Sequence, residues 1–474
     1  MSKQILRLGK ETLIYGASTV AARLFNFFLV PFYTYYLIAA DYGVAATVFA
    51  FMALMNIVYQ YGMDQAYLRF AADGGGKDIF STPFIAVACG AVLLSTLIFT
   101  LSPFIAGALG IGAQHAYLIQ ISAAVMVLDS VNIVPFAKLR YTHRAWYFVG
   151  VRTLSILVNV AGNVLALAYF KAGIAGIFVA GIMASLTSLV LLLPVIKEDF
   201  APRFNTALFA RMFKFSWPFI PAGMASIMVN VIDKPLLSHL SGLANVGVYQ
   251  ANFKIAVFMM LVVSMFDQAW RPFFIQRAGE AGHKELFAKI LTWFAAAAGW
   301  VFLGLALLMP AVIQTPVFSG KYLINPAYWG GMGIITPVLA GYFFYGLYIN
   351  FMVAPVLTKR TGALMWITLA GALASVCANI ILVPRIGIIG AGWAIFISYA
   401  VMAGLLFAFL QKTYPVKYEY GRLSFIAAVI IAALCAGHML GGALTPAVIG
   451  FKILLLLLYP MVVLPVIMPL KTSR

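Results

Sequence analysis

The chain has 474 residues, of which 64% are hydrophobic and only 9% are charged. A soluble protein cannot bury this much apolar surface, so the composition excludes a soluble enzyme or binding domain. The formal net charge of +18 would suggest nucleic acid in a soluble protein. Here no RNA- or DNA-binding motif is present, and lysine and arginine cluster in short gaps between apolar stretches, as expected of cytoplasmic loops.

The apolar stretches predict fourteen transmembrane helices, because a ~30 Å hydrocarbon core takes about 20 helical residues to cross. In chain order they cover residues 12–38, 43–66, 83–108, 114–137, 147–170, 173–196, 213–239, 246–270, 286–313, 327–353, 362–383, 388–411, 422–441 and 446–468. Several contain proline, which predicts bent helices of the kind found around cavities: Pro31, Pro218, Pro221, Pro235 and Pro337. No segment between the helices is long enough for a catalytic domain.

The distribution of basic residues predicts the orientation in the membrane. With the N-terminus in the cytoplasm, 23 of the 31 lysines and arginines lie in cytoplasmic segments and only Lys171, Lys321 and Arg385 lie opposite. This bias predicts an even number of helices with both termini in the cytoplasm. Five basic residues remain within or at the edges of helices: Arg23, Arg152, Lys234, Lys254 and Lys452.

The sequence gives no indication of a metal site or of redox chemistry. Cys89, Cys377 and Cys435 lie within apolar stretches, which predicts buried free thiols and no disulfide. The five histidines are scattered without a metal-binding spacing, so no metal site is expected. No ATP-binding motif is present either, since the glycines before Lys77 lack the spacing of a phosphate loop.

The two halves of the chain repeat each other. Asn26, Pro31 and Gly43 recur 204 residues later as Asn230, Pro235 and Gly247. Asp64-Gln65-Ala66 recurs as Asp267-Gln268-Ala269, and Asn163 with Gly173 and Gly176 matches Asn379 with Gly387 and Gly390. The repeat predicts two pseudo-symmetric six-helix lobes, residues 1–200 and 201–415, and two additional helices in 416–474. Because six is even, the lobes are related by an axis along the membrane normal, which suits alternating access to a central cavity.

Polar residues inside the predicted helices are the candidates for function, since a charge in hydrocarbon costs at least ~2.5–3.5 kcal/mol and usually faces a cavity or a partner. Arg23 and Asn26 share a face of the first helix, and Asn230, Asp233 and Lys234 form a similar stripe on the seventh. Together with Lys254 they predict a cationic cavity for an anionic substrate, most simply a diphosphate. The alternative for the basic residues is a structural ion pair, with Asp233 neutralising Lys234 or Lys254.

Three further aspartates are candidates for coupling or gating. Asp129 could carry protons or pair with Arg152 or Arg23. Asp64 and Asp267 occupy equivalent ends of the second and eighth helices. They are expected to make gate contacts between the lobes or to pair with Arg69 and Arg271.

The sequence resembles the polysaccharide biosynthesis (oligosaccharide-lipid flippase) family. The resemblance rests on Asp233-Lys234-Pro235 followed by the stretch from Ala244 to Lys254, with Asp41-Tyr42-Gly43 and the Asn163 and Asn379 regions in support. This family belongs to the multidrug/oligosaccharidyl-lipid/polysaccharide exporter superfamily. The resemblance implies translocation of an undecaprenyl-diphosphate-linked oligosaccharide to the outer leaflet of the bacterial inner membrane, for surface polysaccharides such as the O-antigen of lipopolysaccharide. Related lipid II flippases carry functional basic residues in the first and eighth spans, where Arg23 and Lys254 lie, and use two extra spans as a lipid groove.

The same resemblance implies a non-enzyme without a bound cofactor, driven by H+, Na+ or the membrane potential. Its expected partners are the lipid-linked oligosaccharide, membrane lipids, and polysaccharide polymerase and chain-length proteins, and no nucleic acid. One alternative is an ion-coupled multidrug or cation antiporter, which the mostly basic deep charges disfavour. Another is a membrane-embedded polysaccharide polymerase or glycosyltransferase, which the short and almost uncharged outer loops disfavour.

Overall fold

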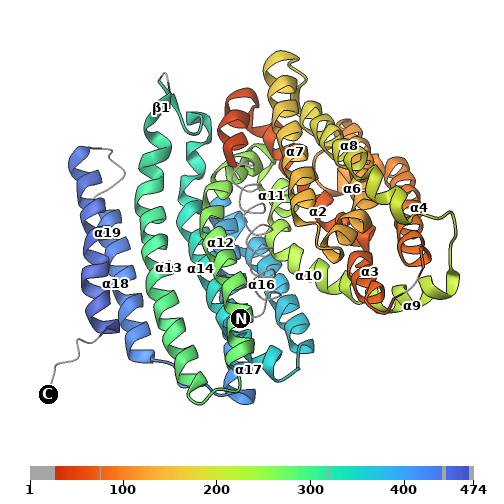
Figure 1. Ribbon diagram of the computed structural model, residues 1–474. Coiled ribbons are helices and arrows are strands. Elements are labelled where there is room, and N and C mark those ends of the chain that lie inside the picture. The colour runs from red at the N-terminus through yellow and green to blue at the C-terminus, as the bar shows by residue number, and fades with distance from the viewer. Residues whose placement is uncertain (1–26, 75, 319, 440–444, 469–474) are drawn as a thin grey trace. The chain divides into compact units, whose positions relative to one another are not determined.

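The computed structural model describes residues 27–74, 76–318, 320–439 and 445–468, and nearly all of them are helical (Figure 1). Within these ranges, 12 helices are long and apolar enough to cross a membrane, or 13 if one bent pair counts as a single span. They match the predicted spans from the second onward, so the all-α polytopic fold is confirmed. The first predicted span begins outside the described residues, and its described part is helical over 27–36.

Contacts between residues divide the chain into two compact units, one ending at Gly247 and the other starting at Val248. The helices of unit 1 are α2 (Ala39–Gln60), α3 (Met63–Ala71), α4 (Asp78–Thr100), α5 (Ser102–Ala108), α6 (Ala116–Tyr141), α7 (Ala145–Val164), α8 (Gly173–Asp199), α9 (Thr206–Ser216), α10 (Phe219–Val231) and α11 (Asp233–Ser241), with short turns η1 (Ala113–His115) and η2 (Leu165–Tyr169). The sequence placed the first boundary at residue 200. Helices α10 and α11 belong to unit 1, where they pack against α2.

The centre of unit 1 is α6, which packs against α4, α8, α2 and α3. A buried apolar cluster joins α3, α4, α6 and α8 to α9 through Met63, Phe80, Val134, Ile196 and Met212. Since lipid tails are as apolar as these side chains, close packing rather than exclusion from water holds such helices together.

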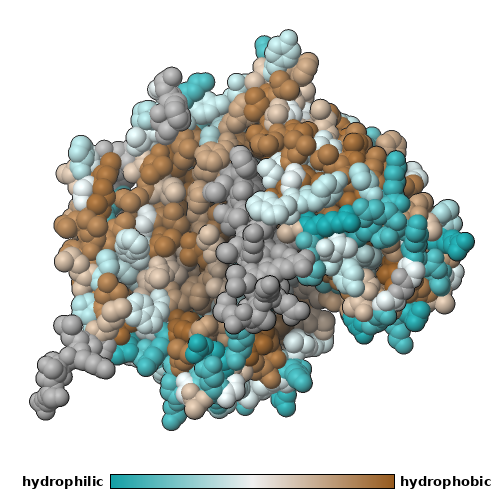
Figure 2. All heavy atoms as spheres, in the orientation of Figure 1, coloured by the Kyte–Doolittle hydropathy of each residue, from teal (hydrophilic) through white to brown (hydrophobic). Residues whose placement is uncertain are grey.

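Unit 2 contains most of α12 (Leu243–Arg277), followed by α13 (His283–Gln314), β1 (Pro316–Phe318), β2 (Lys321–Tyr322), η3 (Pro326–Ile334), α14 (Ile335–Phe351), α15 (Val353–Leu357), α16 (Gly362–Ile386), α17 (Ile388–Thr413), α18 (Tyr420–Met439) and α19 (Pro446–Ile467). The two strands form an antiparallel hairpin in which Pro316 pairs with Tyr322. The last two helices pack on α13, where Tyr459 Oη donates to the Ala296 carbonyl at 3.1 Å. Figure 2 shows mostly brown, apolar atoms over α13, α18 and α19, a surface suited to lipid.

The internal repeat is visible in the backbone of two helical hairpins, α7–α8 and α16–α17. Asn163 Nδ2 donates to the Asn159 carbonyl and Asn379 Nδ2 to the Ser375 carbonyl, each at 2.8 Å. Gly173 and Gly387 then begin the return helices with φ of +58° and +62°. The residues that precede α7 and α16 also match, since His143 and Lys359 have φ of 57° and 56° and lie 216 residues apart, as Asn163 and Asn379 do.

A second repeated feature brings two glycines into direct backbone contact within unit 1. A Cβ added to Gly43 of α2 would lie 1.9 Å from the carbonyl oxygen of Leu243, at the start of α12. A Cβ added to Gly247 would lie 1.9 Å from the carbonyl oxygen of Ala39. Gly43 and Gly247 are 204 residues apart, as are Ala39 and Leu243, so the crossing is pseudo-symmetric. Only glycine permits this approach, as at other close helix crossings in membranes.

Candidate functional site

A polar pocket of about 360 Å³ lies inside unit 1, between the α2–α3 junction, α6, α7 and α8. Helix α6 supplies Asp129, Asn132, Phe136 and Arg140, whose spacing of three and four residues places them along one face. The remaining polar lining comes from Gln60 and Asp64, from Arg152 and Ser155 of α7, and from Ser188 of α8. Placing charged side chains among membrane helices costs free energy, so a pocket that contains several of them is a candidate functional site.

Asp129 and Arg152, predicted to couple ions or to pair, both line this pocket. Asp129 Oδ1 accepts a 2.6 Å hydrogen bond from Ser185 Oγ of α8. The Arg152 guanidinium lies over the ring of Phe136, 4.2 Å from its centroid, and 5.8 Å from the centroid of Phe148. The two charges attract each other across the pocket, and no ion pair between them is present in the described part of the chain.

Asp64 also belongs to this pocket, and its partner differs from the one expected. Arg140 Nη2 of α6 lies 3.2 Å from Asp64 Oδ2, whereas Arg69 pairs with Asp73 at 2.6 Å. In unit 2, Asp267 pairs with Arg271 at 2.6 Å within α12. The two repeat-related aspartates therefore have different partners, one on another helix and one a turn away.

The predicted stripe Asn230, Asp233 and Lys234 lies at a break in the membrane helix, where α10 and α11 meet at 45°. Pro235 has no backbone N–H and disturbs the helix at this point. Lys234 Nζ donates to the Asn230 carbonyl at 2.9 Å and lies 2.8 Å from Asp233 Oδ1. Asp233 is fully buried and Lys234 is 5% exposed. The ammonium group thus both caps α10 and neutralises a buried carboxylate.

The other predicted substrate residues are distributed over the chain. Arg23 and Asn26 lie outside the described residues. Lys254 is half-buried in α12, in unit 2. The three cysteines are free, but each is exposed on a helix surface instead of buried, because apolar stretches of a membrane protein also face lipid. Among the described residues, no group of three His, Cys, Asp or Glu side chains could hold a metal ion.

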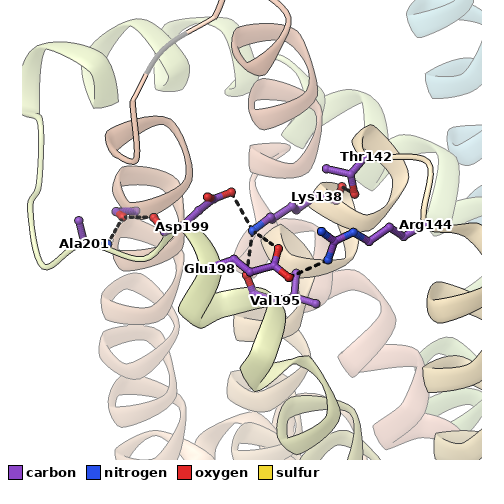
Figure 3. A network of polar contacts seen from close by, with 8 residues as sticks. Lys138, Thr142, Arg144, Val195, Glu198, Asp199 and Ala201 are labelled. Atoms are coloured by element: carbon purple, nitrogen blue, oxygen red, sulfur yellow. Dashed lines mark hydrogen bonds and ion pairs between the residues drawn. The ribbon is translucent and has the colours of Figure 1, made fainter.

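Sequence reasoning missed Lys138, which it assigned to a loop. Helix α6 continues to Tyr141, and Lys138 is only 2% exposed. Its Nζ donates to the Val195 carbonyl at 2.9 Å and pairs with Glu198 at 3.1 Å and Asp199 at 2.7 Å, at the end of α8 (Figure 3). Arg144 joins the same carboxylates through Glu198 at 2.7 Å. The sequence feature that could have indicated this partner for Lys138 is the adjacent acidic pair Glu198 and Asp199, which follows a long apolar stretch.

Replacing Lys138 by methionine is expected to destabilise unit 1 by about 1–2 kcal/mol, because the buried ammonium group is the donor to the Val195 carbonyl and the partner of two carboxylates. The carboxylates are 40% and 44% exposed, which limits the effect. Thermal unfolding in detergent would measure it. Lys197→Met is the matched control, since Lys197 is exposed in the same turn of α8. Equal melting temperatures for the two variants would contradict the expectation.

The repeated hairpins, the broken helix and the internal polar pocket define a polytopic membrane protein with a transporter fold. Solved structures share that fold: the lipid II flippase MurJ in an inward closed conformation matches with a TM-score of 0.75 and 15% identity, over 96% of this chain and 98% of that chain. An inward-facing multidrug resistance transporter of the MATE family matches with a TM-score of 0.61 and 13% identity, over 90% and 99%. A mutant of the Vibrio cholerae MATE transporter VcmN matches with a TM-score of 0.56 and 13% identity, over 86% and 96%.

The family profile described as polysaccharide biosynthesis protein matches residues 36–323. This protein belongs to that family, as its sequence predicted. A search of curated protein sequences gave no significant match. At 13–15% identity the solved structures establish only the fold of this protein. The match to the family profile establishes the family to which it belongs.

Proposed function

We propose that this protein translocates a polyprenyl-diphosphate-linked oligosaccharide across the bacterial cytoplasmic membrane by alternating access. The observation that carries the proposal is a polysaccharide biosynthesis family match combined with the fold of a lipid II flippase along 96% of the chain. The flippase fold supports lipid translocation as the activity, and the polysaccharide biosynthesis family supports a substrate that contains a saccharide. The excess of basic residues in one set of loops supports cytoplasmic termini. Polysaccharide polymerase and chain-length proteins would then act on the translocated product.

In this proposal Arg23 and Lys254 bind the diphosphate, and the polyprenyl tail stays in lipid. Arginine offers a planar fork of donors to phosphate oxygens, and lysine a point charge. Lys234 contributes less, because Asp233 and the Asn230 carbonyl already engage its ammonium group. No chemical bond of the substrate changes in this process, so no catalytic residue is required.

The test is reconstitution of the purified protein in vesicles with a fluorescent undecaprenyl-diphosphate oligosaccharide, whose outward exposure is measured with a membrane-impermeant quencher. Arg23→Ala and Lys254→Gln are each expected to reduce the flipping rate at least about tenfold, the loss expected for one charge-assisted phosphate contact. In cells, Arg23→Ala is expected to abolish surface polysaccharide while the protein remains in the membrane.

Lys452→Gln is the matched control, because Lys452 lies in α19 and is expected to extend toward the membrane surface. Flipping no faster than in protein-free vesicles would contradict the proposal. Normal flipping in both the Arg23 and Lys254 variants would contradict the assigned roles.

The second candidate is an ion-coupled drug or cation antiporter, and the fold match to MATE transporters favours it. The same vesicles distinguish the two. Uptake of organic cations without flipping of the lipid-linked sugar would replace the first proposal by the second.

A further inference from the structure

The polar pocket of unit 1 has no part in the substrate contacts proposed above. Its lining contains four charged side chains: Asp64 from α3, Asp129 and Arg140 from α6, and Arg152 from α7. Helix α2 contributes Gln60 and helix α8 contributes Ser188, both neutral. Because Asp64 and Arg140 form an ion pair, Asp129 and Arg152 are the two charges in the pocket without a direct ionic partner among the described residues.

Two polar atoms of the pocket have no hydrogen-bond partner within the described part of the chain. Asn132 is 3% exposed, and its Nδ2 donates to the Ser185 carbonyl at 3.0 Å while its Oδ1 accepts nothing there. Arg140 Nε is buried and has no acceptor. Water both donates and accepts hydrogen bonds. Water molecules in the pocket would therefore satisfy both the Asn132 acceptor and the Arg140 donor. A pocket of about 360 Å³ with this lining is large and polar enough for several waters.

We propose that this pocket is a hydrated proton site in which Asp129 takes up the proton that drives transport; the inference rests on the proposed flippase function. A hydronium ion in the pocket would transfer its proton to the second oxygen of Asp129, since Oδ1 is engaged by Ser185. An O–H bond forms on the carboxylate, and a water molecule is left. In the reverse step, at a later stage of the transport cycle, Asp129 releases the proton to water on the other side of the membrane.

Protonation would change the contacts between three helices. The 2.6 Å bond from Ser185 to Asp129, which joins α8 to α6, would lose its charge assistance. Arg152 of α7 would lose the negative charge that faces it across the pocket. The positive charge of Arg152 also disfavours a metal cation at this point, whereas a proton joins the carboxylate covalently. The proton is therefore expected to change how α6, α7 and α8 pack.

The first experiment needs no substrate. Infrared difference spectra between low and high pH, recorded on the protein in vesicles, report the carbonyl stretch of protonated carboxyl groups. Exposed carboxyl groups also contribute to these spectra, so the band of interest is the component from a carboxylic acid that is shielded from solvent. We expect this band in the wild-type protein, absent in Asp129→Asn and retained in Asp129→Glu. Asp73→Asn, which removes an exposed carboxylate paired with Arg69, is the control and should keep the band. A band that persists in Asp129→Asn would overturn the site.

The second experiment measures coupling in the flipping assay with an imposed pH gradient. If one proton accompanies each substrate, the limiting ratio of substrate between the leaflets changes about tenfold per pH unit. Asp129→Asn is expected to equilibrate the substrate with no response to the gradient. A wild-type ratio that ignores pH and follows sodium would overturn proton coupling. If the Asp129 band titrates but the protein flips no lipid-linked sugar, the proposed flippase function is refuted and the proton site is retained.

Discussion

Lys234→Met should be the most destabilising single substitution in the broken helix, with an expected loss of about 3–5 kcal/mol. The substitution leaves Asp233, which is fully buried, without its ammonium partner and leaves the Asn230 carbonyl without its donor. The measurement is the yield of folded protein and its melting temperature in detergent.

The double variant Asp233→Asn with Lys234→Met separates structure from transport. It removes both charges and keeps an acceptor beside the backbone N–H of residue 234, to which Asp233 Oδ1 is bound at 3.0 Å. We expect it to recover most of the stability and to flip the lipid-linked substrate. A stable double variant that flips nothing would contradict this and would return Lys234 to the substrate-binding residues.

Gly43→Ala is expected to produce the second large effect. Its Cβ would lie 1.9 Å from the Leu243 carbonyl oxygen, a contact that real Cβ atoms never make, so α2 and the start of α12 must separate by more than about 1 Å. Backbone atoms cannot turn aside as a flexible side chain does. The expected cost is about 3 kcal/mol, at the upper end for overpacked sites.

Thermal unfolding would measure the loss, with Gly150→Ala as the control. Gly150 lies in α7, and a Cβ there meets no atom within 4 Å. Because alanine favours helix over glycine by up to about 1 kcal/mol, Gly150→Ala should be neutral or stabilising. If Gly43→Ala were equally stable, the close crossing of the two helices would be disproved.

The positions of the helices could be predicted because a membrane imposes length and apolarity on each span, and both are local properties. The α10–α11 break was predictable for the same reason, since Pro235 acts on the backbone next to it. The ends of helices were less predictable. Helix α6 continues past its predicted end at residue 137 because Lys138 finds carboxylates on α8, about sixty residues away in the chain.

The candidate site shows the same limit. The charges Asp129 and Arg152 were identifiable from their depth in apolar stretches, but Asn132, Arg140 and Ser185 were not. Their role depends on which helices pack together, and helical periodicity gives the face of one helix without naming its neighbour. For that reason Asp64 was matched with Arg69, five residues away, although its partner Arg140 lies on another helix.

The matched hairpins α7–α8 and α16–α17 show that the two halves share a backbone plan, and their side chains at matched positions differ. The 216-residue spacing that relates His143 to Lys359 and Asn163 to Asn379 sets the neutral Thr368 of α16 against Arg152 of α7. In the second half, α14 contributes packed aromatic rings, with Tyr345 centred 6.1 Å from Tyr348 and 5.0 Å from Tyr399. At the matched position of Arg152 and Thr368 the first half carries a charge and the second half does not, although the second half has charged residues elsewhere, such as Asp267 and Arg271. The two halves are thus alike in these hairpins and differ in the charge that they carry at matched positions.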